Sequence, residues 1–133
     1  MRIFERRLVA APSALQRVRH DVAEVLDEEG VSSDRIEDTL LVLSELGTNA
    51  IHASGYGDEV AVRLDMDRRG DVFVEVEDAG AGFRLSEQLR LPEPDDEHGR
   101  GLSIVCLVAD ETSVKRRKRH TIVTARIPAT STA

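Results

Sequence analysis

A carboxylate and a carboxamide one helical turn apart, Glu45 and Asn49, are the first residues in this sequence whose types and spacing suit chemistry. Side chains four residues apart lie on the same face of a helix. Leu43, Gly47 and Ala50 form an apolar stripe next to them, so the polar pair lies beside the buried seam. An amide oxygen suits a divalent metal ion and a nearby carboxylate suits a general base, whereas a solvated helix edge is the simpler interpretation of the pair alone.

A second pattern, Asp78-x-Gly80-x-Gly82, directly follows a segment that alternates like a strand. Glycine has no Cβ, so the backbone at these positions can approach a flat ligand closely. The aspartate carboxylate is then able to accept a hydrogen bond from an exocyclic amine. A glycine-rich loop with a turn-forming aspartate has the same signature, so this pattern alone is weak.

The third pattern is Gly99-Arg100-Gly101-Leu102, which precedes an apolar run. The free N–H groups at a helix N-terminus attract anions, and glycine leaves room for a phosphate. The sequence contains no Gly-Lys-Ser/Thr and no βαβ unit around this segment, which excludes a Walker motif and a Rossmann fingerprint. A loop that uses glycine only for clearance is the alternative interpretation.

These patterns need a scaffold, which the spacing of apolar residues and the turn residues predict. The expected elements are a strand at 2–9, a helix from Pro12 to Gly30, a helix that starts at an Asp34–Glu37 capping box and ends near Ser54, strands at 59–65 and 71–77, a buried helix at 102–108, and strands at 111–117 and 121–127. Helices and antiparallel strands are segregated along the chain. We therefore expect an α+β fold, a two-layer sandwich whose helices cover one face of a mixed, mostly antiparallel sheet.

Composition places these elements in one globular domain, expected to span residues 1–133. The 25 acidic side chains against 18 basic ones give a net charge of −7, which argues against direct nucleic-acid binding because neutralising phosphates needs a basic face. No apolar run reaches the roughly 18 residues of a membrane span. Cys106 is the only cysteine, which excludes an internal disulfide framework. We expect a cytoplasmic protein that does not bind membranes.

Taken together, the three patterns resemble the GHKL ATPase superfamily, whose nucleotide-binding fold is the Bergerat fold. The matching motifs are the N box (Glu45 to Asn49), the G1 box (Asp78, Gly80 and Gly82), the G2 box (Gly99 and Gly101) and an ATP lid over residues 83–98. Their order and spacing fit nearly the whole chain.

The resemblance implies a role for each matching residue. Asn49 would hold a Mg²⁺ ion that bridges the ATP phosphates, and Glu45 would act as general base toward an attacking hydroxyl. Asp78 would accept a hydrogen bond from the adenine amino group, with Thr121 close to the same edge. The adenine pocket would be shaped by Gly80 and Gly82, and the β- and γ-phosphates would be surrounded by Gly99, Arg100, Gly101 and Leu102.

Within the superfamily the chain is most similar to the stand-alone anti-sigma-factor serine/threonine kinases of the RsbW type. The segments SELGTNA and GRGLSIV and the final Arg126-Ile127-Pro128 carry this similarity. Two positions differ from the family pattern. His52-Ala53 lies one position earlier than the usual His-Ala pair, and His120 stands where relatives often have glycine.

This similarity implies an anti-sigma factor that binds ATP and Mg²⁺ and phosphorylates a serine or threonine of a STAS-type anti-sigma-factor antagonist. Such a kinase also sequesters a sigma factor and thereby regulates transcription, and its relatives are commonly homodimers. Two other functions fit the same motifs. One is a nucleotide-regulated module that binds the sigma factor or the antagonist without kinase turnover. The other is a stand-alone ATPase domain of the histidine-kinase kind.

Overall fold

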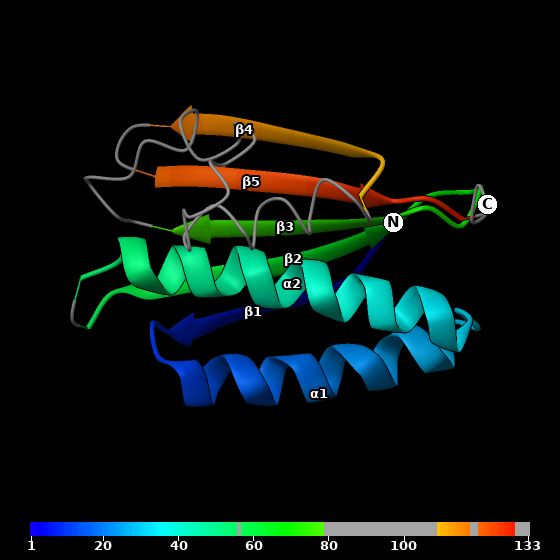
Figure 1. Ribbon diagram of the computed structural model, residues 1–133, viewed down its shortest axis with the longest axis horizontal. Helices are drawn as coiled ribbons and strands as arrows, with labels where there is room; N and C mark the ends of the chain where they lie inside the picture. Colours follow the sequence, from blue (N-terminus) through cyan, green and yellow to red (C-terminus); the bar gives the residue numbers. More distant parts are fainter. Residues whose placement is uncertain (56, 79–108, 118–119, 130–133) are drawn as a thin grey trace, which may run out of the picture.

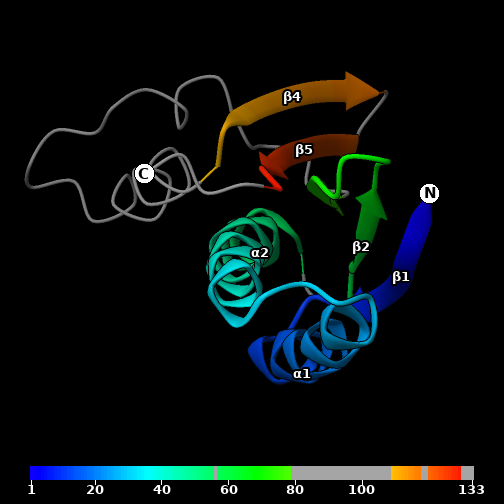
Figure 2. The same ribbon diagram turned by 90° about the vertical axis from the view of Figure 1, so that its right-hand side faces the viewer.

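The computed structural model describes residues 1–55, 57–78, 109–117 and 120–129. Its elements, in chain order, are β1 (Arg2–Val9), α1 (Pro12–Glu28), α2 (Ser33–Ala53), β2 (Glu59–Met66), β3 (Val72–Asp78), β4 (Glu111–Arg117) and β5 (His120–Ile127). The strands form one antiparallel sheet in the order β1-β2-β3-β5-β4. Both helices lie on the same face of this sheet (Figures 1 and 2). The predicted α+β sandwich is therefore confirmed.

Alternation of buried and less buried residues, clearest along β3 and β5, gives the sheet two different faces. In β3, Val72, Val74 and Val76 are buried under the helices, whereas Phe73, Glu75 and Glu77 point to the other side. Successive side chains of a strand point to opposite faces, so this pattern follows directly from the sequence. We call the side under the helices the covered face and the other side the open face.

The first helix is the simplest element to derive from the sequence. Pro12 lies in the first turn of α1, where its missing N–H and fixed φ are tolerated. A stripe of buried apolar residues at helical spacing faces the sheet: Leu15, Val18, Val22 and Leu26. The helix ends just before Gly30, which adopts a left-handed φ of 81° that favours glycine. The predicted helix and its end are thus confirmed.

The predicted start of the second helix is wrong by two residues. The N-cap is Ser32, whose Oγ accepts a hydrogen bond from the backbone N–H of Arg35 at 3.4 Å. Asp34 lies inside the first turn, where its negative charge interacts favourably with the helix N-terminus. Serine and aspartate are almost equally good N-caps, so the run Ser32-Ser33-Asp34 does not select one of them. The expected end near Ser54 is confirmed.

The hairpins follow the prediction closely. The strands expected at 59–65 and 71–77 are β2 and β3, and those expected at 111–117 and 121–127 are β4 and β5. In the turn between β2 and β3, the Asp67 carboxylate accepts hydrogen bonds from the N–H groups of Arg69 and Asp71, both at 2.9 Å. The helix expected at 102–108 lies outside the described residues. Neither α1 nor α2 is long and apolar enough to cross a membrane.

Candidate functional site

Three of the residues that the sequence singled out meet at one end of the sandwich. Asp78 is the last residue of β3, and Thr121 is the second residue of β5. The two are directly paired across the antiparallel ladder. Asn49 lies in the last turns of α2, and Figure 1 shows the end of α2, the end of β3 and the start of β5 at the same end of the molecule.

Asp78 and Thr121 both point to the covered face and are both almost completely buried, with 2% and 0% of their surface exposed. Directly opposite residues of an antiparallel pair have Cβ atoms about 5 Å apart. A carboxylate and a hydroxyl therefore lie next to each other under the helical layer. Burying such groups is costly unless they form hydrogen bonds.

The packing of α2 determines where Asn49 points. Gly47 lies against Leu15 of α1, so closely that a Cβ on Gly47 would come within 2.6 Å of a Leu15 methyl. A helix turns by about 100° per residue, so Asn49 is turned by about 160° from Gly47. It therefore lies on the flank of α2 away from α1. Since α1 packs against β1 and α2 against β3, this flank is on the β5 side of the sheet.

Two polar atoms at this end of the molecule are buried without a hydrogen-bond partner in the described part of the chain. They are the side-chain amide nitrogen of Asn49 and the hydroxyl of Thr121. Nearly all buried polar groups in proteins have a partner, and an unsatisfied one costs about 1–3 kcal/mol. Two different elements therefore offer unsatisfied hydrogen-bonding groups to a polar ligand at this end of the fold.

Glu45 lies one turn before Asn49 and is partly exposed. The two side chains share a flank of α2, as the spacing predicted. Glu45 therefore lies next to the candidate site, where a group brought in from solvent can reach its carboxylate. The other predicted positions lie outside the described residues: Gly80, Gly82, the lid at 83–98, Gly99, Arg100, Gly101 and Leu102.

The donor chemistry of the site suits magnesium together with a phosphate ligand. No group of three or more His, Cys, Asp or Glu side chains that could hold a metal ion exists among the described residues. Mg²⁺ does not need such a cage, because it usually binds one or two protein oxygens and completes its shell with waters and substrate phosphates. The amide of Asn49 can turn to present its oxygen, which is a suitable ligand. The residues therefore fit the group that the motifs imply.

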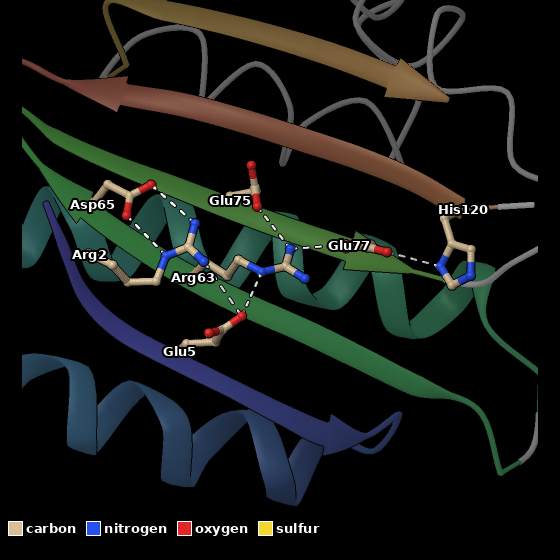
Figure 3. Close-up of polar contacts among 7 residues, drawn as sticks. All are labelled: Arg2, Glu5, Arg63, Asp65, Glu75, Glu77 and His120. Atoms are coloured by element: carbon tan, nitrogen blue, oxygen red, sulfur yellow. Dashed lines mark hydrogen bonds and ion pairs between the residues drawn. The ribbon is translucent and has the colours of Figure 1, made fainter. Parts of the chain in front are cut away.

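The two histidines that depart from the family pattern are both exposed. His52 is exposed on the outer surface of α2. His120 points to the open face, where its Nδ1 lies 3.1 Å from an oxygen of Glu77 (Figure 3). Because Thr121 points to the opposite face, the side chain of His120 does not compete with it for the site.

The open face carries an ion-pair network that was not predicted from the sequence. Nε of Arg63 lies 2.9 Å from Glu5, and its Nη1 lies 2.8 Å from Glu75 and 2.9 Å from Glu77 (Figure 3). Burial alone would lower the pKa of Arg63, but the hydrogen bonds from the three carboxylates outweigh it and raise the pKa above its ordinary value. Opposite charges at alternate positions of neighbouring strands are the signal that could have revealed this network.

The comparisons with known proteins agree with this geometry. The family described as Histidine kinase-like ATPase domain matches residues 8–127. No curated protein matches the chain significantly. Solved structures with the same fold include the SiaB-SiaC complex from Pseudomonas aeruginosa, with a TM-score of 0.74 and 14% identity over 95% of this chain and 89% of that one.

Two further structures extend the comparison. The RsbU and RsbW domains of Rv1364c from Mycobacterium tuberculosis give a TM-score of 0.68 and 19% identity over 94% of this chain, which spans only 32% of that longer chain. The catalytic domain of histidine kinase ThkA gives a TM-score of 0.61 and 19% identity over 95% of this chain and 96% of that one. At such identities the likeness concerns the fold alone. The family match covers most of the sequence, and the chain belongs to the Histidine kinase-like ATPase domain family.

Proposed function

We propose that this protein is an ATP-dependent serine/threonine kinase of the RsbW type, which phosphorylates a STAS-type anti-sigma-factor antagonist and sequesters a sigma factor. The observation that carries the proposal is the meeting of Asn49, Asp78 and Thr121 at one end of a Histidine kinase-like ATPase domain. Asn49 and Thr121 each have a buried polar atom that lacks a partner among the described residues. The fold likeness to structures that contain an RsbW domain and SiaB supports it.

Asp78 and Thr121 are the proposed adenine-recognition pair. The exocyclic amine of adenine donates hydrogen bonds, and the buried Asp78 carboxylate accepts them. The hydroxyl of Thr121 donates to a ring nitrogen, which satisfies its unpaired atom. Guanine presents a carbonyl oxygen where adenine has its amine, and that oxygen would face the carboxylate without a proton. The pair therefore favours ATP over GTP.

Asn49 is the proposed magnesium ligand, through its amide oxygen. The ion, when bound, would neutralise charge on the phosphates of the nucleotide. The proposal also keeps the glycine-rich positions in their expected roles, with Gly80 and Gly82 at the adenine and the segment from Gly99 to Leu102 at the phosphates. Asn49 and Asp78 come from different layers of the sandwich, so a nucleotide that contacts both would be held along its length.

Glu45 is the proposed general base. It lies one turn before Asn49 and is partly exposed, so the hydroxyl of a protein substrate can approach it from solvent. As the hydroxyl oxygen bonds to the γ-phosphorus and ADP leaves, the hydroxyl proton moves to the Glu45 carboxylate. A positioned base of this kind contributes about 10²–10⁴-fold to the rate.

The test is phosphate transfer from ATP to a STAS-domain protein of the same host, measured for the Glu45→Gln variant. We expect nucleotide affinity to be retained and transfer to fall by about 10²–10⁴-fold. Glu37→Gln is the matched control, because Glu37 is an exposed glutamate on the same helix, two turns earlier. Unchanged transfer in Glu45→Gln would remove the base role.

The same assay separates the two other functions. ATP binding without transfer to any STAS-domain protein would indicate a nucleotide-regulated binding module. Transfer to a histidine would give an acid-labile phosphate, whereas phosphoserine and phosphothreonine are stable in acid. An acid-stable product therefore supports the proposed kinase, and an acid-labile one supports a histidine-kinase activity.

A further inference from the structure

Five consecutive basic residues, 115–119, stand out in a chain that is acidic overall. They are five of its 18 basic side chains, so the rest of the chain is more negative than the net charge of −7 suggests. The first three, Lys115, Arg116 and Arg117, are the last residues of β4, and all three are exposed. Neither Lys115 nor Arg117 forms an ion pair with a described residue. These three residues concentrate positive charge, and we call them the basic end of β4.

The basic end of β4 lies at the same end of the molecule as the candidate site (Figure 1). In the β4–β5 ladder Arg116 is directly paired with Thr121, and Arg117 with His120. Neighbouring strands lie about 4.8 Å apart and successive residues about 3.3 Å, so the Cα atoms of Lys115 and Arg117 lie about 6 Å from that of Thr121. The Debye length at physiological ionic strength is about 8 Å. Charges this close to the site therefore act on a ligand that approaches it.

The other side of the same end is acidic. β2 begins there with the exposed Glu59, which Asp58 directly precedes. The next residue, Val60, is paired with Asp78, so these two carboxylates lie on the β2 side of the site. The proposed magnesium ligand Asn49 lies on the flank of α2 that faces the β5 side of the sheet. The basic end of β4 is thus on the side of the site where the proposal places the phosphates.

This arrangement bears on how a nucleotide reaches the site. A nucleoside triphosphate and a protein with a net charge of −7 repel each other at long range. Local charge of the opposite sign beside a site attracts the ligand and raises its association rate by about 10–10³-fold. Removing such a charge at the rim of a site changes the association rate and its salt dependence. The dissociation rate changes little, because the charge makes no contact in the bound state.

We propose that the basic end of β4 steers the polyanionic nucleotide to its site, with Lys115 and Arg117 as the main contributors. This inference rests on the proposed function, because it requires that ATP binds at Asn49, Asp78 and Thr121. It adds residues that act on the association of the nucleotide from outside the binding contacts. It also gives a role to a basic run that the kinase motifs leave unused.

The test is rapid mixing of the whole chain with Mg²⁺ and ATP that carries a fluorescent label on its ribose. In Lys115→Gln/Arg117→Gln we expect the association rate constant to fall about 5-fold at low salt, while the dissociation rate constant stays within about twofold. At 1 M salt, where the Debye length is about 3 Å, the variant and the wild type should associate equally fast. Labelled adenosine has no phosphate, so its association should be the same in both proteins. Equal rate constants for ATP at low salt, or equal losses for ATP and adenosine, would overturn the proposal.

Arg68→Gln/Arg69→Gln is the matched control. Both arginines are exposed in the β2–β3 turn at the opposite end of the molecule (Figure 1), and replacing them removes the same two positive charges. These charges lie many Debye lengths from the site, so we expect the association rate constant for ATP to stay within about twofold. A fall as large as that of Lys115→Gln/Arg117→Gln would show that ATP responds only to the net charge of the protein. The position of the basic end of β4 would then have no role.

Phosphate transfer distinguishes the failure of this inference from the failure of the proposed function. Slower association in Lys115→Gln/Arg117→Gln, without transfer to any STAS-domain protein by the wild type, would support the steering and reject the kinase. Unchanged association with normal transfer would reject the steering and leave the kinase intact. A raised KM for the protein substrate with unchanged ATP association would also reject the steering, because the bases would then bind the protein substrate. Absence of ATP binding to the wild type would reject both.

Discussion

At the end of β3 and the start of β5, polar residues on the two faces of the sheet have different surroundings. Asp78 and Thr121 point to the covered face, and their neighbours Glu77 and His120 point to the open face. On the open face Glu77 lies close to both His120 and Arg63, and Arg63 connects β1, β2 and β3 (Figure 3). On the covered face the Thr121 hydroxyl is buried without a partner in the described residues. At this end of the sheet, therefore, the charges on the open face are paired, and the covered face holds a buried hydroxyl that has no partner among the described residues.

This difference shows why a large cavity is a poor guide to the site. A depression of about 580 Å³ lies on the open face between the Arg63 network and β4. Its carboxylates Glu75 and Glu77 are already bound to Arg63, so a cationic ligand would have to compete with Arg63 for them. At the end of the covered face, a ligand would instead complete hydrogen bonds that are missing. The missing bonds are therefore the better indicator of where a ligand binds.

The largest expected effect comes from Asp78→Asn. The amide would turn an N–H group toward the adenine amine, so an acceptor is lost and two donors face each other. We expect nucleotide affinity to fall about 100-fold, the equivalent of one hydrogen bond to a charged group in a buried site. Titration calorimetry with ATP and Mg²⁺ measures it.

Glu77→Gln is the matched control for that experiment, because it makes the same chemical change at the adjacent residue on the other face. We expect its nucleotide affinity to stay near that of the wild type. Equal losses in the two variants would contradict the contrast between the faces. They would show that nucleotide affinity depends on the charge at the end of β3 and not on the face to which the carboxylate points.

The sheet, its two faces and the helices were predictable from the sequence because they depend on local periodicity. Val72, Val74 and Val76 alternate with polar residues, and the apolar residues of α1 recur at helical spacing. The position of β5 between β3 and β4 was not predictable in this way, since strand order depends on contacts between distant segments. The N-cap of α2 was misassigned because three consecutive residues all suit a cap.

The candidate site was predictable only in part. Asn49 and Asp78 could be named from their motifs and Thr121 from the family resemblance, and the structure brings their elements to one end of the fold. The motifs do not reveal that Thr121 and Asn49 have buried atoms without partners, because burial depends on the complete fold. Arg19 and Arg63 illustrate the same limit. Both are ordinary charged residues in the sequence, and only the packing shows that Arg63 has three partners and Arg19 none in the described chain.

Arg63→Gln tests how much the ion pairs of the open face contribute to the stability of the protein. Only 13% of the Arg63 side chain is exposed, so its removal leaves Glu5, Glu75 and Glu77 close together without their shared cation. We expect the free energy of unfolding to fall by about 2 kcal/mol, between the values for exposed and for buried ion pairs. Urea denaturation measures it.

Arg2→Gln provides the comparison for that loss. Arg2 forms ion pairs on the same face, but 45% of its side chain is exposed, so we expect a loss below about 1 kcal/mol. Nucleotide affinity should stay unchanged in both variants. A clear loss of nucleotide affinity in Arg63→Gln would mean that the open face helps to shape the site, against the separation argued above.

The expected effect of Thr121→Val is the most specific one, because it has opposite signs in the protein without nucleotide and in the protein with nucleotide. In Thr121→Val a methyl group replaces a buried hydroxyl that has no partner in the described residues. Without nucleotide the variant should be at least as stable as the wild type, since an unsatisfied polar group is removed. With nucleotide it should bind about 10-fold more weakly, because the bond that Thr121 donates to adenine is gone. Thr124→Val, three residues along β5 on the open face, should leave nucleotide affinity unchanged. A Thr121→Val variant that lost stability and kept its affinity would show that the hydroxyl stabilises the fold and does not contact the nucleotide.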